Sequence, residues 1–165
     1  MKPILKKIGI ALLIVLAAIQ FIRPEKNIAA SPSEQHISKV QPVPADVDAI
    51  LKKACYDCHS NNTVYPWYNN IQPVAWWLND HVQDGKKHLN FDVYTSYNLR
   101  RQFHKMEEIE EQVKEGEMPM TSYTLIHSDA KLTEAEKNTL INWSIAFRDT
   151  MKAHYPIDSL IKPKK

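Results

Sequence analysis

The sequence predicts an all-α fold with one domain and appended segments. Its 165 residues are enough to bury one modest core. The chain contains only 3 glycines, beside 10 prolines, and so few glycines disfavour a turn-rich β sandwich. Apolar residues recur instead at helical spacing within long charged stretches. We therefore expect four parts: an N-terminal segment (1–26), a linker (27–44), a helical domain (45–155) and a basic tail (156–165).

The N-terminal segment has the features of an export signal. Three lysines precede an apolar run over residues 8–22, and charged residues follow it. As a helix this run would be about 22 Å long, short of the roughly 30 Å hydrocarbon core. Sites for cleavage are poor, so we expect a retained single-pass anchor in the bacterial inner membrane, with the domain facing the periplasm. A cleaved signal peptide is the alternative.

Residues 27–44 precede the first helix of the domain. They carry prolines and small polar residues without an apolar period, which predicts a linker. Apolar residues then recur at helical spacing: Val47, Ile50, Leu51 and Ala54. We expect a short amphipathic helix that ends at Cys55.

The helix leads into the stretch Cys55-Tyr56-Asp57-Cys58-His59. Two cysteines one helical turn apart can each add across a vinyl group of haem, and the adjacent histidine can then bind the iron. The stretch predicts one haem c per chain. Cys55 and Cys58 would form the thioethers, and His59 would be the proximal iron ligand.

A thiol or zinc protein is the less favoured interpretation of these cysteines. The chain has only 2 cysteines, so a zinc site needs two further ligands. His81 and His88 lie too far downstream and too far apart for the usual spacing. A thioredoxin-like pair follows a strand, and no β-branched run precedes Cys55.

Aromatic residues gather after the motif, in the runs Tyr65–Tyr68 and Trp76–Trp77. Trp67, Tyr68 and Trp76 are candidates for packing against haem, although an ordinary aromatic core fits equally well. A helix around Asp80 would close at Gly85. His81 and His88 are candidate iron ligands, but histidines in such places are more often surface residues.

A second iron ligand is expected after the next helix. Residues 99–113 have helical periodicity, and Gly116 stops the helix. Met118 follows and is held extended by Pro119, which favours it as the distal thioether ligand. Met120 shares the loop and is the alternative, whereas Met106 lies on an apolar stripe typical of a core. Ligation by histidine and methionine suits electron transfer.

The last predicted helix follows a capping box, Thr133-Glu134-Ala135-Glu136, and continues to about Ala153. We expect it to pack on the first helix of the domain. Tyr155-Pro156 ends it.

The order of these elements resembles that of class I cytochromes c. More closely, the chain from Cys55 to Trp143 is similar to the bacterial haem-binding domain family. The shared motifs are C-Y-D-C-H-S-N-N from Cys55, Y-P-W-Y at Tyr65–Tyr68 and G-E-M-P at Gly116–Pro119. The resemblance covers roughly residues 45–155. It implies a cytochrome c-like helical domain around one covalent haem, with His59 proximal and, by the cytochrome pattern, Met118 distal.

We expect a membrane-anchored monohaem c-type cytochrome that carries single electrons between partner proteins in the periplasm or membrane. The alternative is a haem-based redox or gas sensor, or a peroxidase-like enzyme, in which Met118 dissociates and His81, His88 or His127 is the polar distal group. We find no nucleophile and base pair, so no catalytic residue is predicted. Residues 45–160 carry 12 basic and 17 acidic side chains, without the basic stripe of a nucleic-acid-binding protein.

Overall fold

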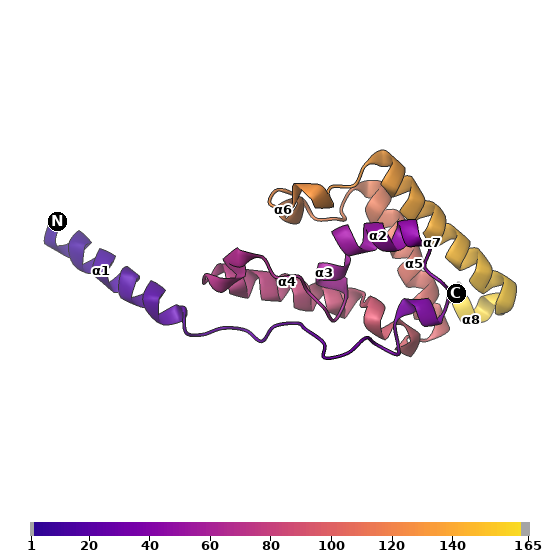
Figure 1. The fold of residues 1–165 in the computed structure, drawn as a ribbon, viewed down its shortest axis with the longest axis horizontal. Helices are drawn as coiled ribbons and strands as arrows, with labels where there is room; N and C mark the ends of the chain where they lie inside the picture. Colours follow the sequence, from indigo (N-terminus) through magenta and orange to yellow (C-terminus); the bar gives the residue numbers. More distant parts are fainter. Residues whose placement is uncertain (1, 163–165) are drawn as a thin grey trace.

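The computed structural model describes residues 2–162, and these residues form helices without a β-strand. The predicted all-α class is confirmed. Figure 1 shows α1 extending away from a body made by the other helices. The elements are α1 (Lys2–Ile19), η1 (Ile37–Lys39), α2 (Ala45–Ala54), α3 (Tyr56–His59), η2 (Trp67–Asn70), α4 (Val74–His88), η3 (Phe91–Ser96), α5 (Leu99–Glu115), α6 (Thr121–Thr124), η4 (Ser128–Ala130), α7 (Glu134–His154) and α8 (Ile157–Leu160).

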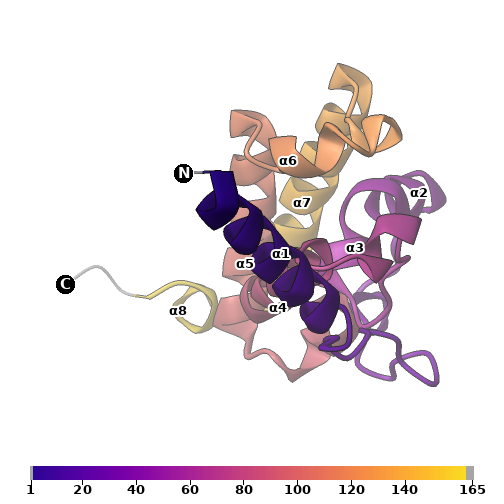
Figure 2. The same ribbon diagram turned by 90° about the vertical axis from the view of Figure 1, so that its left-hand side faces the viewer.

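The helix α1 differs from the predicted anchor. It ends at Ile19, before the apolar run ends at Ile22, and it includes the lysines that precede that run. Its apolar side chains from Ile4 to Leu16 are exposed, and Figure 2 shows the helix standing in front of the body. Among the helices of residues 2–162, none combines the length and the apolar character that a membrane span requires.

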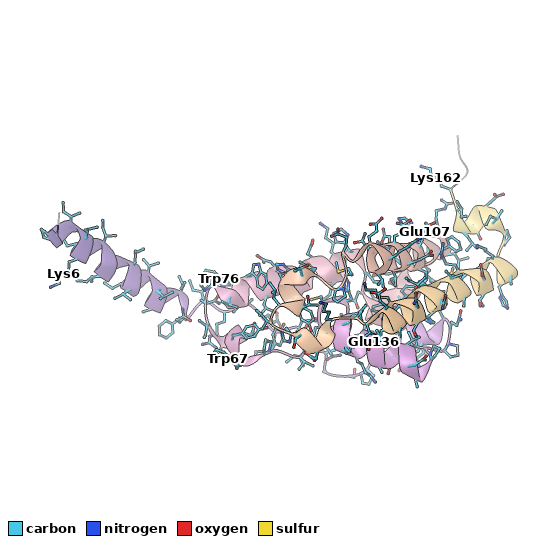
Figure 3. All side chains as sticks on the ribbon, turned by 90° about the horizontal axis from the view of Figure 1, so that it is seen from above. Lys6, Trp67, Trp76, Glu107, Glu136 and Lys162 are labelled. Carbon is cyan, nitrogen blue, oxygen red and sulfur yellow. The ribbon has the colours of Figure 1, made fainter. Side chains whose placement is uncertain are left out.

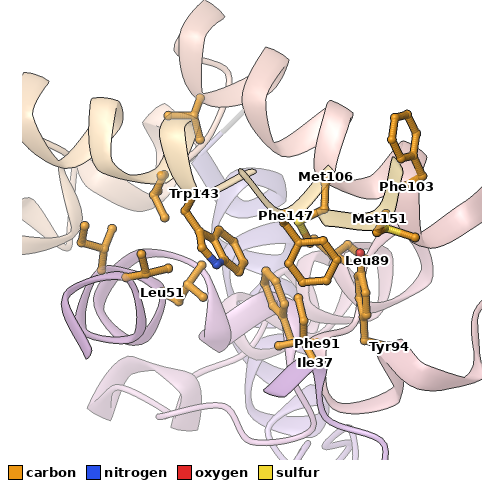
Figure 4. Close-up of a cluster of buried hydrophobic side chains, with 14 of the residues drawn as sticks. Ile37, Leu51, Leu89, Phe91, Tyr94, Phe103, Met106, Trp143, Phe147 and Met151 are labelled. Atoms are coloured by element: carbon orange, nitrogen blue, oxygen red, sulfur yellow. The ribbon is translucent and has the colours of Figure 1, made fainter. Parts of the chain in front are cut away.

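The core lies where α7 packs against α5 and α2, with α8 closing one end. Figure 4 shows Trp143 and Phe147 of α7 facing Leu51, Phe91 and Tyr94. The side chain of Phe147 is fully buried and meets Trp143 and Tyr94 edge to face. The predicted packing of the last helix on the first helix of the domain is confirmed.

Local signals in the sequence set the ends of the two long helices. Gly116 has φ 78°, in the left-handed region that favours glycine, and it ends α5. At the start of α7, the N–H of Thr133 donates to Glu136 Oε2 and the N–H of Glu136 donates to Thr133 Oγ1. Each helix end therefore satisfies its own free backbone groups, as the sequence predicts.

Glu136 also connects the start of α7 to α2. Its carboxylate accepts a hydrogen bond from Lys53 Nζ of α2 (2.5 Å), and this bond, followed by that from the Thr133 N–H, lowers the pKa of Glu136 to about 2. Because the folded-state pKa is below the ordinary 4.5, Glu136 stabilises the native state at neutral pH. That contribution is lost as the pH falls from about 4.5 towards 2.

We expect Glu136→Gln to lower the free energy of unfolding at pH 7 and to weaken its decline in acid. Chemical unfolding at a series of pH values from 7 to 2 measures both changes. Glu134→Gln is the matched control, because Glu134 lies in the same turn and, among the described residues, pairs with the neighbouring Lys137 alone. An unchanged acid profile in Glu136→Gln would contradict the role given to this carboxylate.

Residues 27–44 lie against the domain, which differs from a free linker. The side-chain amide of Asn27 is buried and donates to Ser60 O and to Thr63 Oγ1, both at 2.9 Å. Ile37 of η1 is fully buried in the core. Composition suggested a linker, but these contacts join residues more than 30 positions apart, and such pairing leaves no local pattern.

The predicted basic tail, 156–165, lies only partly within the described residues. Its first part forms α8, and Leu160 of that helix is buried against the core. Leu160 therefore anchors α8 on the core, whereas the other described residues of the tail are exposed or half-buried. The lysines at positions 164 and 165 lie outside the described residues.

Candidate functional site

The two cysteines lie at the junction of α2 and α3. Cys55 follows the last residue of α2, and Cys58 lies one turn later within α3. Both are free thiols and half-buried. Burial, with the nearby Cys58, raises the pKa of the Cys55 thiol to about 12. Burial, with Asp57, raises that of Cys58 to about 11.

The raised pKa values keep both thiols protonated at neutral pH. Redox-active cysteines commonly have lowered pKa values that favour the thiolate, so the pair lacks this feature of a thioredoxin-like site. The described residues also contain no group of three or more His, Cys, Asp or Glu side chains arranged to hold a metal ion. At the cysteines the described residues thus supply neither a lowered thiol pKa nor a grouped set of metal ligands.

His59 is held by one of its ring nitrogens. Its Nδ1 lies 3.0 Å from the carbonyl oxygen of Gly85 and 2.9 Å from that of Leu89, at the end of α4. Carbonyl oxygens only accept, so Nδ1 carries the proton and Nε2 keeps its lone pair. Burial lowers the pKa of His59, which keeps the ring neutral. A neutral imidazole fixed in this way fits the requirements of an iron ligand.

The sequence predicts that a helix closes at Gly85, and this prediction is wrong. α4 continues through Gly85 to His88. A Cβ at position 85 would lie 2.7 Å from the carbonyl oxygen of Cys58 and 3.0 Å from its Cβ. Gly85 is therefore the point at which α4 approaches α3, and this approach brings the Gly85 and Leu89 carbonyls to His59.

We expect Gly85→Ala to push α4 away from α3 and to loosen the hydrogen bonds of His59. Overpacking of this kind costs about 1–3 kcal/mol, although alanine is otherwise favoured over glycine within a helix. Urea unfolding measures the loss, and the yield of covalent haem measures its effect on the site. Gly9→Ala is the control, since its Cβ meets nothing within 4 Å. Equal or greater stability in Gly85→Ala would contradict the close contact.

The methionine segment returns to the cysteine motif. Met118 and Met120 are half-buried in the connection between α5 and α6, and α6 is the short orange helix above α4 in Figure 1. Tyr123 of α6 donates a hydrogen bond from its Oη to Asp57 Oδ2 (2.7 Å). Tyr123, three residues after Met120, thus ties this segment to the turn that carries both cysteines.

A second set of contacts joins the α6 region to η2. The ring of His127 stacks on Tyr123, with centroids 4.5 Å apart, and its Nε2 lies 2.6 Å from Tyr68 Oη. His127 and Tyr68 are therefore part of the contact between the α6 region and η2. The carboxylate of Asp57, with burial as the larger cause, raises the pKa of Tyr123, so this phenol stays a donor.

Of the other candidate residues, Trp67 borders this contact, because its ring meets that of Tyr68 edge to face with centroids 5.9 Å apart. Trp67 is 76% exposed, and the indole of Trp76 donates to Ile22 O (3.0 Å), next to the end of α1. Figure 3 shows both tryptophans at that end of the body. His81 Nδ1 donates to Trp77 O (2.8 Å), and His88 faces Asp84 on the surface. Met106 is fully buried in the core, as its apolar stripe predicts.

Sequence reasoning missed three parts of the site: Gly85, the Leu89 carbonyl and the bond between Tyr123 and Asp57. A glycine within a helical pattern can signal close packing, so Gly85 carried a usable signal. The hydrogen bonds from His59 to Leu89 and from Tyr123 to Asp57 left no signal in the sequence, because their partners are 30 and 66 positions apart in the chain.

Comparison with known proteins gives one match. A family model described as a haem-binding domain matches residues 14–146, which include the cysteines, His59 and the methionine segment. No curated protein matches the chain, and no solved structure matches it either.

Proposed function

Because this chain belongs to the haem-binding domain family, we propose that it carries one haem c, bound through Cys55, Cys58 and His59, and transfers single electrons between exported proteins. When bound, haem supplies a one-electron iron couple. The chain's own residues hold the group, orient its ligands and set its surroundings. Attachment of haem c takes place outside the cytoplasmic membrane in bacteria, which agrees with the lysine-led apolar run at the start of the chain.

The position of His59 is the observation that carries the proposal. Two backbone carbonyls fix the ring through Nδ1, and the neutral Nε2 is left as the donor atom for iron. Leu89, which provides one carbonyl, is itself buried in the core. The ring orientation therefore depends on the packed end of α4 rather than on a loop.

We propose Met118 as the second iron ligand, with Met120 as the alternative in the same segment. The bond from Tyr123 to Asp57 supports this assignment, because it holds the methionine segment near the cysteine turn. A thioether stabilises ferrous iron relative to a second imidazole and raises the reduction potential. Such a site favours electron transfer over binding of external molecules.

An absorption spectrum of the full chain tests the function. The protein is produced in a host that attaches haem c, and spectra are recorded before and after dithionite, with and without carbon monoxide. We expect a low-spin, six-coordinate spectrum that carbon monoxide does not change. Rapid binding of carbon monoxide or turnover of peroxide would instead assign the chain to sensing or peroxidase chemistry, and a colourless protein would refute haem binding.

We expect Met118→Ala to open the iron to carbon monoxide and to lower the reduction potential, because the thioether is removed from the sixth position. Met120→Ala is the matched control, with the same side chain removed two positions away. Redox titration and carbon monoxide difference spectra measure both effects. If Met120→Ala alone has these effects, the distal ligand is Met120 and not Met118.

A further inference from the structure

A cationic groove lies between the end of α4, the first half of α5 and α8. Its volume is about 550 Å³. Phe103 and Leu160 are buried beneath it, and Ile161, which also lines the groove, is 46% exposed and gives the groove an accessible apolar part. Figure 3 shows Lys162 and Glu107 at this end of the molecule, away from Trp67 and Trp76. The basic side chains that line it are Lys87, Arg100, Arg101, Lys105 and Lys162.

Most of this positive charge has no acidic partner. Among the described residues, the ammonium groups of Lys87 and Lys162 form neither a hydrogen bond nor an ion pair. Arg100 Nη2 donates to Asp158 O (3.0 Å), and the Arg101 guanidinium lies over the Tyr97 ring (4.0 Å). These partners are neutral, so both arginines keep their full charge.

The acidic side chain that lines the groove, Glu107, already has basic partners, whereas the carboxylate of Asp158 on α8 forms no ion pair among the described residues. Lys105 is paired with Glu108. The carboxylate of Glu107 lines the groove, but it faces His104 Nδ1 (3.2 Å) and Arg148 Nη1 (3.7 Å). The groove is therefore a locally positive surface on a domain in which acidic residues outnumber basic ones. Such a surface attracts a ligand of opposite charge.

The groove adjoins the support of His59. Lys87 and His88 lie within the turn between Gly85 and Leu89, whose carbonyls accept from His59 Nδ1. A ligand in the groove would therefore lie against the turn that orients this imidazole.

We propose that this groove docks an acidic peptide segment of a partner protein, with carboxylates facing Lys87, Arg100 and Arg101 and an apolar side chain against Ile161. An exposed apolar side chain among cations suits a peptide that alternates acidic and apolar residues. A small inorganic anion would use the charges but leave Ile161 uncovered. This inference goes beyond electron transfer and does not require haem.

The test uses the full chain and a fluorescent peptide that alternates Glu and Leu, with binding followed by anisotropy. We expect affinity to fall as salt is raised and the double variant Lys87→Glu/Lys162→Glu to bind about tenfold more weakly or worse. Lys131→Glu is the control, because Lys131 is an exposed lysine outside the groove. We expect this control to bind as the unaltered chain does.

Three outcomes would overturn the proposal. If a peptide with Gln in place of Glu binds equally tightly, charge does not determine binding. If Lys131→Glu weakens binding as much as the double variant does, the peptide does not bind in the groove. Displacement of the peptide by inorganic phosphate, beyond that caused by chloride at equal ionic strength, would assign the groove to a small anion. Haem content is recorded in the same samples, so loss of peptide binding with haem intact leaves the proposed function standing.

Discussion

Replacing both Cys55 and Cys58 with alanine will leave no haem on the chain after denaturing electrophoresis. The two sulfurs are the only thiols in the sequence, so no other side chain can form a thioether. Haem staining of the gel and the alkaline pyridine spectrum measure the loss. Each single substitution keeps one possible thioether, and we expect reduced staining with a spectrum shifted by the one unreacted vinyl group.

The matched control for these substitutions is Lys52→Ala, an alanine replacement close before the motif on α2. We expect it to retain full haem staining, because within residues 2–162 Lys52 pairs with the neighbouring surface residue Asp48 alone. Haem that survives denaturation in the double cysteine variant would contradict covalent attachment through these residues. It would not by itself contradict ligation by His59, which a separate spectrum of His59→Ala examines.

Phe147→Ala will lower the free energy of unfolding by about 3–5 kcal/mol, the range for removing a buried aromatic ring. Phe147 is fully buried and packs edge to face against Tyr94 and Trp143. Its loss leaves a cavity where α7 meets the rest of the core. A domain of this size has a total stability of roughly 5–15 kcal/mol, so the expected loss is a large part of the whole.

Urea unfolding followed by circular dichroism measures this change. Phe21→Ala is the control, because it removes the same ring from a side chain that is 88% exposed. We expect Phe21→Ala to change the free energy of unfolding by less than about 0.5 kcal/mol. Equal effects of the two substitutions would show that the packing around Phe147 contributes no more than a surface contact.

The sequence by itself determined the features that depend on neighbouring residues. Apolar residues at helical spacing, the glycine at position 116 and the capping box at Thr133 specify α5 and α7, because helix formation and capping use groups within four residues of one another. The two cysteines and His59 are likewise consecutive or one turn apart. Their chemistry could therefore be predicted before any tertiary contact was known.

Where one residue type serves two purposes, the sequence was not enough. Gly85 could end a helix or permit a close contact, and only the position of Cys58 beside it decides for the contact. The apolar run at the start of the chain likewise suggested a helix to Ile22. α1 instead ends at Ile19, and the side chain of Gln20 bonds to the backbone of Gln72.

Only the tertiary structure decided what surrounds the candidate site. The two carbonyls that hold His59, the bond from Tyr123 to Asp57 and the cationic groove all join residues that are distant in the chain. Residues 27–44 are placed in the same way, by burial of Asn27 and Ile37 among partners elsewhere in the sequence. The physical reason is that burial and hydrogen bonding depend on which segments the packed helices bring together, and the order of residues along one segment does not contain that information.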